Sequence, residues 1–381
     1  MQPTFYEFFA GGGMARAGLG EGWRCLFAND IDPKKGRSYT QNWGDAEFRL
    51  GDIFALNAAD LPGQADLAWA SFPCQDLSLA GLGAGLAGER SGAFGGFDLL
   101  LHALRNQGRA PRMLVIENVV GTITSRNGRD FEAICRSLQV LGYVFGALTI
   151  DAVHFLPQSR PRLFVVAVRK DVSIAPGLRS IAPVEPWASD ALRRAQSALP
   201  AYVRTAWRWW RLPAPPRRNG DFTQLVEAGE DLRWHSAAET ERLIAMMSPV
   251  NRAKLQLAIS DGGRHVGTVY RRTRRDEAGE KVQRAEIRFD GVAGCLRTPE
   301  GGSSRQTVVI VDGGRVRSRL MSAREAARLM GMPESYRLPE RYNEAYHLLG
   351  DGVAAPVVRF LAENLLAPLA RPPMRPVLAA A

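Results

Sequence analysis

The N-terminal stretch that decides the fold reads Phe8-Phe9-Ala10-Gly11-Gly12-Gly13-Met14-Ala15-Arg16-Ala17-Gly18-Leu19. The apolar run that ends here predicts a strand, and the residues after Gly13 predict a helix. Glycines between a strand and a helix let the backbone approach a nucleotide-like ligand without a Cβ clash. The dinucleotide-binding fingerprint is not cleanly present, so a structural turn remains an alternative. Asp30, about 20 residues on, would suit the ribose hydroxyls of either a nicotinamide or an adenosyl cofactor.

Short apolar runs alternate with turn residues and amphipathic stretches from this segment to about Lys170. This alternation is typical of an α/β fold, in which helices cover a largely parallel sheet. Ligands of such folds bind at the carboxyl edge of the sheet. We predict strands at Thr4–Phe9, Arg24–Asn29, Leu67–Ser71, Met113–Glu117, Val144–Asp151 and Leu163–Val168.

The composition changes after Lys170, where prolines, tryptophans and arginines follow in irregular order. We therefore expect three segments: a first part of the core at 1–170, a loop-rich module at 171–317, and a return to the core at 318–381. In the third segment Ser322 and Glu325 form a predicted capping box, and Gly331 and Pro333 would end the helix that follows. A last helix is expected from Pro356 to Leu366, and the Pro- and Ala-rich tail 367–381 is expected to be loose.

Charge and cysteine content narrow the class of protein. The 381 residues carry a formal charge of +10, which suits a polyanionic partner but does not by itself identify one. No charge-free apolar run reaches the roughly 20 residues of a membrane helix, and no secretion signal is visible, so we expect a cytoplasmic protein. The four cysteines, Cys25, Cys74, Cys135 and Cys295, lack metal-ligand spacing, so we expect free thiols and no metal.

One of these cysteines stands at a strand end, in Ser71-Phe72-Pro73-Cys74-Gln75. A thiol at the carboxyl edge of the sheet can be a nucleophile if cationic or dipolar neighbours lower its pKa. The alternative is a buried structural cysteine, which is the commoner fate of a lone cysteine and the reading that we adopt for Cys25, Cys135 and Cys295.

Pro73-Cys74-Gln75 resembles the nucleophile motif of the DNA (cytosine-5)-methyltransferases of bacterial or phage type. The family's other motifs follow in its order over residues 1–170 and 318–366. They are Phe9-Ala10-Gly11 with Gly13, Asp30-Ile31, Asp52-Ile53, Glu117-Asn118-Val119, Gln158 with Arg160 and Arg162, and Arg319 through Pro333.

This resemblance implies a Rossmann-like S-adenosylmethionine-dependent methyltransferase core with a smaller, loop-rich target-recognition domain. It implies that the thiolate of Cys74 adds to C6 of a flipped-out cytosine and makes C5 nucleophilic. The catalytic residues would be Cys74, Glu117, Arg160 and Arg162. The residues that bind S-adenosylmethionine would be Phe9, Ala10, Gly11, Gly13, Asp30, Ile31, Asp52, Ile53, Pro73, Asp351 and Val353.

Contacts to DNA are expected from the catalytic core and from the middle module. Clustered arginines suit phosphates, and short polar side chains near glycines suit close approach. The predicted set is Gln75, Ser78, Gln158, Arg271, Arg272, Arg274, Arg275, Arg297, Ser303, Ser304 and Arg305. The glycine-rich stretch after Cys74 is expected to close over DNA. Trp207, Trp209 and Trp210 could stack on bases, although a local core of the module is the favoured reading.

The sequence departs from the family at three positions. Gly350-Asp351-Gly352-Val353 has a carboxylate where the family usually has asparagine. Asp351 could contact the cofactor's sulfonium end, accept a hydrogen bond from the glycine loop, or alter which cofactor fits. Met14 replaces a common glycine, and Glu7 replaces a frequent aspartate.

Other functions compete with a sequence-specific DNA methyltransferase. One branch of the family methylates cytosine in tRNA, but its recognition region is small, so the long segment 171–317 favours DNA. A non-catalytic DNA-binding regulator is disfavoured by the intact motifs, and a nicotinamide oxidoreductase would leave them unexplained. We expect a monomer that acts on double-stranded DNA at the nucleoid and does not physically require a cognate restriction enzyme. The sequence does not give the recognition site.

Overall fold

A computed structural model describes residues 2–73, 92–218, 220–227, 229, 232–275, 279–297 and 305–370. Several predicted functional residues lie outside these ranges: Cys74, Gln75, Ser78, Ser303 and Ser304. The predicted closing loop after Cys74 also falls there, apart from Gly92.

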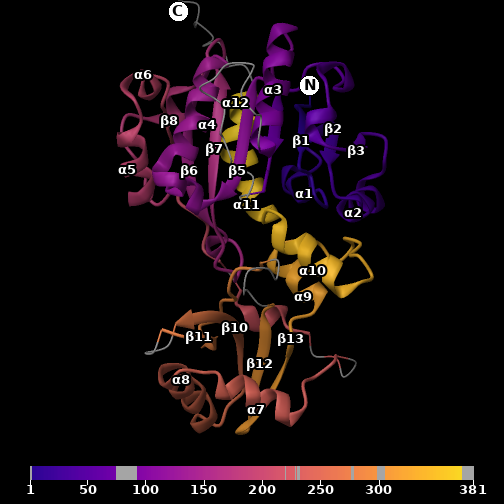
Figure 1. Ribbon diagram of the computed structural model, residues 1–381, viewed down its shortest axis with the longest axis vertical. Helices are drawn as coiled ribbons and strands as arrows, with labels where there is room; N and C mark the ends of the chain where they lie inside the picture. Colours follow the sequence, from indigo (N-terminus) through magenta and orange to yellow (C-terminus); the bar gives the residue numbers. More distant parts are fainter. Residues whose placement is uncertain are drawn as a thin grey trace, which may run out of the picture. The chain divides into compact units, whose positions relative to one another are not determined.

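The chain forms two compact units (Figure 1). The first contains residues 1–150, 161–214 and 357–381, and the second contains residues 151–160 and 215–356. These divisions differ from the segments expected at 170 and 317. Residues 171–214 belong to the first unit, and a ten-residue excursion, Asp151–Arg160, belongs to the second.

A seven-stranded sheet organises the first unit, in the order β3-β2-β1-β4-β5-β7-β6. The pairs among β3, β2, β1, β4 and β5 are parallel, whereas β7 is antiparallel to β5. All six predicted strands are confirmed, and β3 was missed. The strands are β1 (Thr4–Phe8), β2 (Arg24–Asp30), β3 (Phe48–Leu50), β4 (Leu67–Ala70), β5 (Met113–Val119), β6 (Tyr143–Asp151) and β7 (Pro161–Arg169).

Helices complete this α/β unit, and apolar residues of four of them, α3 to α6, join the strands in one large core. Asp32 caps α2 by accepting a hydrogen bond from the Lys34 amide, and α4 has the amphipathic pattern of a helix on a sheet. The helices are α1 (Met14–Leu19), α2 (Pro33–Trp43), α3 (Ala93–Asn106), α4 (Arg129–Val140), α5 (Asp190–Ala198), α6 (Ala201–Arg204), α11 (Ala355–Leu361) and α12 (Ala367–Ala370), with a π-helical turn at Ala362–Leu366.

The tryptophans of residues 171–214 are core residues of the first unit. Trp207 packs edge-on against Phe131 of α4 and Phe145 of β6, and Trp210 is fully buried. A short ribbon of β8 (Arg179–Ser180) and β9 (Trp209–Trp210) carries two of these tryptophans. Base stacking by Trp207, Trp209 and Trp210 is therefore wrong. The favoured interpretation, a local core of the middle module, was right that these tryptophans are buried, but they belong to the core of the first unit.

The second unit is built on a four-stranded antiparallel sheet in the order β11-β10-β12-β13. Figure 1 shows α7 and α8 beside this sheet, and their apolar residues share a core with Val269, Ile287 and Val309. The elements are α7 (Ala237–Ala245), α8 (Pro249–Ser260), β10 (His265–Arg275), β11 (Lys281–Arg288), β12 (Thr307–Asp312), β13 (Arg315–Leu320), α9 (Ala323–Leu329) and α10 (Tyr342–Asp351).

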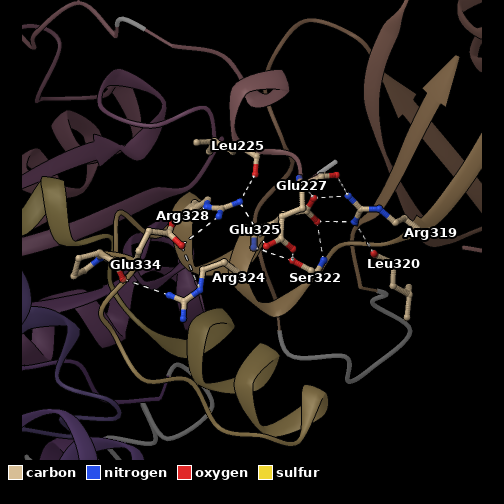
Figure 2. A network of polar contacts seen from close by, with 10 residues as sticks. Leu225, Glu227, Arg319, Leu320, Ser322, Arg324, Glu325, Arg328 and Glu334 are labelled. Atoms are coloured by element: carbon tan, nitrogen blue, oxygen red, sulfur yellow. Dashed lines mark hydrogen bonds and ion pairs between the residues drawn. The ribbon is translucent and has the colours of Figure 1, made fainter. Parts of the chain in front are cut away.

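The predicted capping box at the start of α9 is confirmed: Ser322 accepts from the Glu325 amide, and Glu325 accepts from the Ser322 amide. Glu325 is fully buried and also pairs with Arg319 at 2.5 Å (Figure 2). The Glu227 amide donates to the same carboxylate, and Glu227 in turn accepts from the Ser322 hydroxyl. One capping residue thus ties β13, α9 and the segment at Glu227 together. Gly331, at φ 73°, follows the helix as predicted.

By length and composition alone, the segment Tyr342–Ala370 is long and apolar enough to cross a membrane. Within its most apolar window, 56% of the residues are buried inside the protein. The backbone leaves the helical conformation at Gly352, where ψ is 171°. Buried core helices pass the same test, so the segment is weak evidence for a membrane. Residues 367–370 of the tail expected to be loose are helical, and the rest of it lies outside the described residues.

Candidate active site

The glycine loop after β1 adopts a conformation that glycine alone accommodates easily. Gly13 has a φ of 76°, and a Cβ there would lie 2.2 Å from Nε1 of Trp43. That same Nε1 donates to the Gly12 carbonyl oxygen at 3.0 Å. Gly11 also has a positive φ, of 56°, but the space beside its Cα is open. Gly13 is therefore required by packing, whereas Gly11 leaves room for a ligand.

Asp30, at the carboxyl end of β2, braces this loop. Its Oδ2 accepts from the Gly11 amide and its Oδ1 from the Asp32 amide, both at 2.8 Å. Burial raises the pKa of the Asp30 carboxyl against the lowering effect of these hydrogen bonds. A carboxylate has further lone pairs for hydroxyl donors, so the predicted ribose contact is compatible with this geometry.

The other predicted cofactor residues of the first unit differ in exposure. Ile31 is 62% exposed and offers apolar surface. Asp52 is exposed and accepts from the Phe54 amide at 3.0 Å, which fixes the turn there. Ile53 is buried in the core against Gly96, so its side chain supports the site from beneath. Open space at Gly11, a buried acid and an exposed aliphatic side chain fit an adenosyl cofactor.

Glu117 and Arg162 meet across the pair of β5 and β7. Arg162 Nε lies 3.3 Å from Glu117 Oε1, and both side chains are largely buried. The antiparallel register places Val119 opposite Arg162, so a short stretch of each strand brings the two charges together. At a bound base, such a carboxyl group can hold a proton, and the guanidinium beside it can stabilise the charge that develops.

Asn118, which the predicted site omitted, positions the chain just before Cys74. Its Nδ2 donates to the Phe72 carbonyl oxygen at 3.1 Å, and its Oδ1 accepts from the Thr122 hydroxyl at 3.1 Å. The side chain is buried. Asn118 therefore links the strand end that carries Glu117 to the segment that enters Pro73 and Cys74. Its place between Glu117 and Val119 in the quoted motif was the signal that could have identified it.

Gln158 and Arg160 belong to the second unit and are fully buried there. Gln158 donates to the Leu329 carbonyl at 2.6 Å and accepts from the Leu296 amide. Arg160 donates to the carbonyls of Leu296, Gly350 and Gly352 at 2.6 to 2.8 Å. These contacts hold both side chains within the second unit. The predicted DNA contact of Gln158 and the predicted catalytic role of Arg160 stay predictions.

The predicted phosphate-binding arginines lie on β10. Arg271, Arg272, Arg274 and Arg275 are all exposed. Glu286 pairs with Arg274 at 2.5 Å and with Arg272 at 3.4 Å. Arg297 is exposed as well, whereas Arg305 is half-buried, donates to Asn343 and stacks over Tyr342. The structure therefore gathers an exposed basic strand but assigns Arg305 a contact within the protein.

Asp351 and Val353, predicted to bind the cofactor, lie in the second unit. Asp351 is the exposed last residue of α10, and Val353 is buried. The carbonyls on both sides of Asp351 are the ones that Arg160 holds. The predicted contacts of Asp351 and Val353 with the cofactor stay predictions.

Two cysteines have the structural role expected of them. Cys25 and Cys135 are buried, and burial raises the pKa of the Cys25 thiol to about 12 and that of Cys135 well above its usual value. Cys295 is half-exposed and receives a hydrogen bond from Arg160. Among the described residues, no cluster of His, Cys, Asp or Glu could hold a metal ion.

Comparisons with known proteins agree with this arrangement. The model of the family "C-5 cytosine-specific DNA methylase" matches residues 3–367. The type II methyltransferase M.HhaI of Haemophilus parahaemolyticus is 26% identical over 95% of this chain and 93% of its own length. M.BsuFI of Bacillus subtilis is 36% identical over 45% of this chain and 40% of that relative.

Solved structures show the same fold. S. pombe Dnmt2 methyltransferase superposes with a TM-score of 0.62 at 19% identity, covering 96% of this chain and 99% of that one. A likeness at this identity supports the fold alone. The family match over nearly the whole chain goes further: this protein belongs to the C-5 cytosine-specific DNA methylase family and is a DNA (cytosine-5)-methyltransferase that uses S-adenosylmethionine.

Proposed function

We propose that this chain methylates C5 of a flipped-out cytosine within a specific sequence of double-stranded DNA, with Cys74 as the nucleophile. The observation that carries the proposal is the Glu117–Arg162 pair, at the end of the strand next to the one that leads into Pro73. Asn118 holds the carbonyl of Phe72, two residues before Cys74, against the same strand end. This arrangement supports a nucleophile, an acid and a cation around one base.

The chemistry requires each of these groups. Cytosine C5 is a poor nucleophile, so a thiolate first adds to C6, which forms the C6–S bond and turns C5 into an enamine carbon. Glu117 would hold the proton at N3 as electron density moves into the ring, and Arg162 would stabilise the charge that develops there. S-adenosylmethionine, held by the loop around Gly11 and by Asp30, supplies the electrophilic methyl group. Loss of the C5 proton and expulsion of the thiolate then restore the aromatic ring.

Target recognition would come from the middle of the chain. We assign it to the second compact unit, where the exposed arginines of β10 lie, in place of the whole of residues 171–317. The relatives M.HhaI and M.BsuFI are named type II methyltransferases, which supports a sequence-specific target. We further infer that the enzyme acts as a monomer in the cytoplasm, associates with the nucleoid through its substrate, and does not need a restriction enzyme as a physical partner.

Bisulfite sequencing of DNA from cells that express the chain tests the proposal. Unconverted cytosines should recur at one position of one short sequence, and cells that express Glu117→Gln should lack them. Methylation scattered over unrelated sequences would contradict a specific target. Total RNA from the same cells should carry no new protected cytosine, and protection confined to RNA would replace DNA by RNA as the substrate.

A further inference from the structure

A pocket of about 280 Å³ opens on the second unit, and none of its lining residues was placed in the active site. Its walls come from α8, β10, β11 and the segment around Cys295. Thr268, Tyr270 and Arg272 alternate along β10, so they project from one face, opposite to the face of Val269 that packs into the core. The volume would hold a phosphate group with a few waters, because each water occupies about 30 Å³.

The lining of this pocket is strongly cationic. Lys254, Arg272, Arg288 and Arg297 contribute positive charge, and Glu286 is the one acid among the lining residues. Arg272 is paired with Glu286 and Arg288 with Asp290. Within the part of the chain that the structure describes, the side chains of Lys254 and Arg297 make no hydrogen bond or ion pair. Two unpaired cations at one hollow favour an anionic ligand.

A buried amide also lines the pocket with an unused acceptor. Gln306 is 1% exposed; its Nε2 donates to the Cys295 carbonyl at 3.4 Å, and its Oε1 has no hydrogen-bond partner among the described residues. Gly294 makes room for this amide, because a Cβ there would lie 2.8 Å from Nε2. A buried carbonyl oxygen without a donor is costly. Since Oε1 cannot face an anion directly, a water that donates both to it and to an anion would satisfy both groups.

The wall that carries Cys295 is held rigidly. Arg160 binds the carbonyl of Leu296 and the Cys295 sulfur, and Gln158 accepts from the Leu296 amide. The cationic surface also continues beyond the pocket, because Arg274 follows Tyr270 and Arg272 on the same face of β10. A fixed anion pocket beside a row of further cations suits a polymer of phosphates better than a single free ion.

We propose that this pocket binds one phosphodiester group of the DNA substrate, with Lys254 and Arg297 on the phosphate oxygens and a water bridging to Gln306. The inference rests on the proposed function for the identity of the polyanion. It assigns Lys254 and Gln306 to the DNA interface, which no sequence motif indicated.

The test pairs a protein variant with a chemical change in the DNA. A duplex that contains the bisulfite-defined site is prepared with each phosphate in turn replaced by a neutral methylphosphonate, and its Kd is measured by fluorescence anisotropy. For Lys254→Met we expect a severalfold weaker Kd on unmodified DNA and a slope of log Kd against log salt that is smaller by about 1. At one phosphate position, the methylphosphonate should weaken the wild type but weaken Lys254→Met no further.

Lys281→Met is the matched control, because it removes the same charge from the exposed start of β11, outside the pocket. The loss of DNA affinity caused by Lys281→Met and the loss caused by the methylphosphonate at that position should add. Additive losses for Lys254→Met at every position would overturn the proposal while leaving methylation by the wild type, and so the proposed function, intact. Lys254-dependent binding of inorganic phosphate to the free protein, without coupling to any DNA position, would assign the pocket to a free anion and equally overturn it.

Discussion

Arg162 Nε lies 3.3 Å from Glu117 Oε1, and the two largely buried side chains come from neighbouring antiparallel strands. This pairing lets one group hold a proton while the other stabilises charge. Glu117→Gln keeps the size of the side chain but removes the acid. Its turnover number should fall by about 10²- to 10⁴-fold, the range for loss of general acid catalysis. The dissociation constant for S-adenosylmethionine, measured by calorimetry, should stay within twofold; turnover near the wild-type level would remove Glu117 from the chemistry.

The covalent step predicts that Cys74→Ser abolishes methyl transfer, because a serine hydroxyl is far less ionised than a thiol and attacks C6 poorly. Incorporation of a labelled methyl group into DNA measures the loss. Duplex DNA with 5-fluorocytosine at the target should form a denaturant-resistant adduct with the wild type and none with the variant, since C5 then carries no proton to remove. Cys25→Ser, at a buried cysteine whose thiol pKa is raised by burial, is the control and should still form the adduct.

The buried carboxyl group of Glu7 should make the free energy of unfolding depend on pH. Burial raises the pKa of its carboxyl to about 8, and its Oε2 has no hydrogen-bond partner among the described residues. The folded protein therefore keeps a proton that the unfolded chain loses above its ordinary pKa of 4.5. The free energy of unfolding should fall as the pH rises from about 5 to 8. Glu7→Gln should flatten this part of the urea-unfolding profile, whereas Glu21→Gln, at an exposed carboxyl, should leave it as steep as in the wild type.

The strands and the helix signals were readable in the sequence because they are local. Ser322 and Glu325 stand three residues apart and form the predicted box. The edge strand β3 escaped detection because its three residues are too short to show an alternating pattern. The compact units divide the chain at other residues than the expected segments do. Composition reports the abundance of loops, whereas Trp207 and Trp210 pack against residues far away in the chain.

Only the site residues that belong to a sequence motif could be predicted. Glu117 and Arg162, 45 positions apart in the sequence, were paired through the family resemblance. The resemblance assigned Gln158 to DNA and both Arg160 and Arg162 to catalysis, but the chain passes from the second unit to the first between Arg160 and Pro161. The spacing of these residues in the sequence does not indicate that the chain changes unit there. Lys254 and Gln306 meet at one pocket through tertiary folding alone.

The exposed arginines of β10 predict a steep dependence of DNA affinity on salt. Each phosphate that a cation neutralises adds about 0.9 to the slope of log Kd against log salt. Because Glu286 already pairs with Arg272 and Arg274, replacing Arg271, Arg272, Arg274 and Arg275 by Met should lower the slope by about two to three. Binding should weaken to a similar degree for specific and unrelated duplexes. A loss confined to the specific duplex would make these arginines base readers.

The structure predicts that a lysine affects stability at position 160 but turnover at position 162. The guanidinium of Arg160 donates to three carbonyl oxygens, in two buried contacts and one part-buried contact, and to the Cys295 sulfur. A lysine ammonium with its three hydrogens cannot reach all four acceptors together. Arg160→Lys should therefore lower the free energy of urea unfolding by about 1 to 3 kcal/mol, the cost of a buried acceptor left without a donor. A lysine at position 162 can still pair with Glu117, so Arg162→Lys should change stability by less than about 1 kcal/mol and chiefly lower turnover. If Arg160→Lys kept full stability and lost turnover instead, Arg160 would belong to the catalytic set after all, and its carbonyl contacts would be incidental.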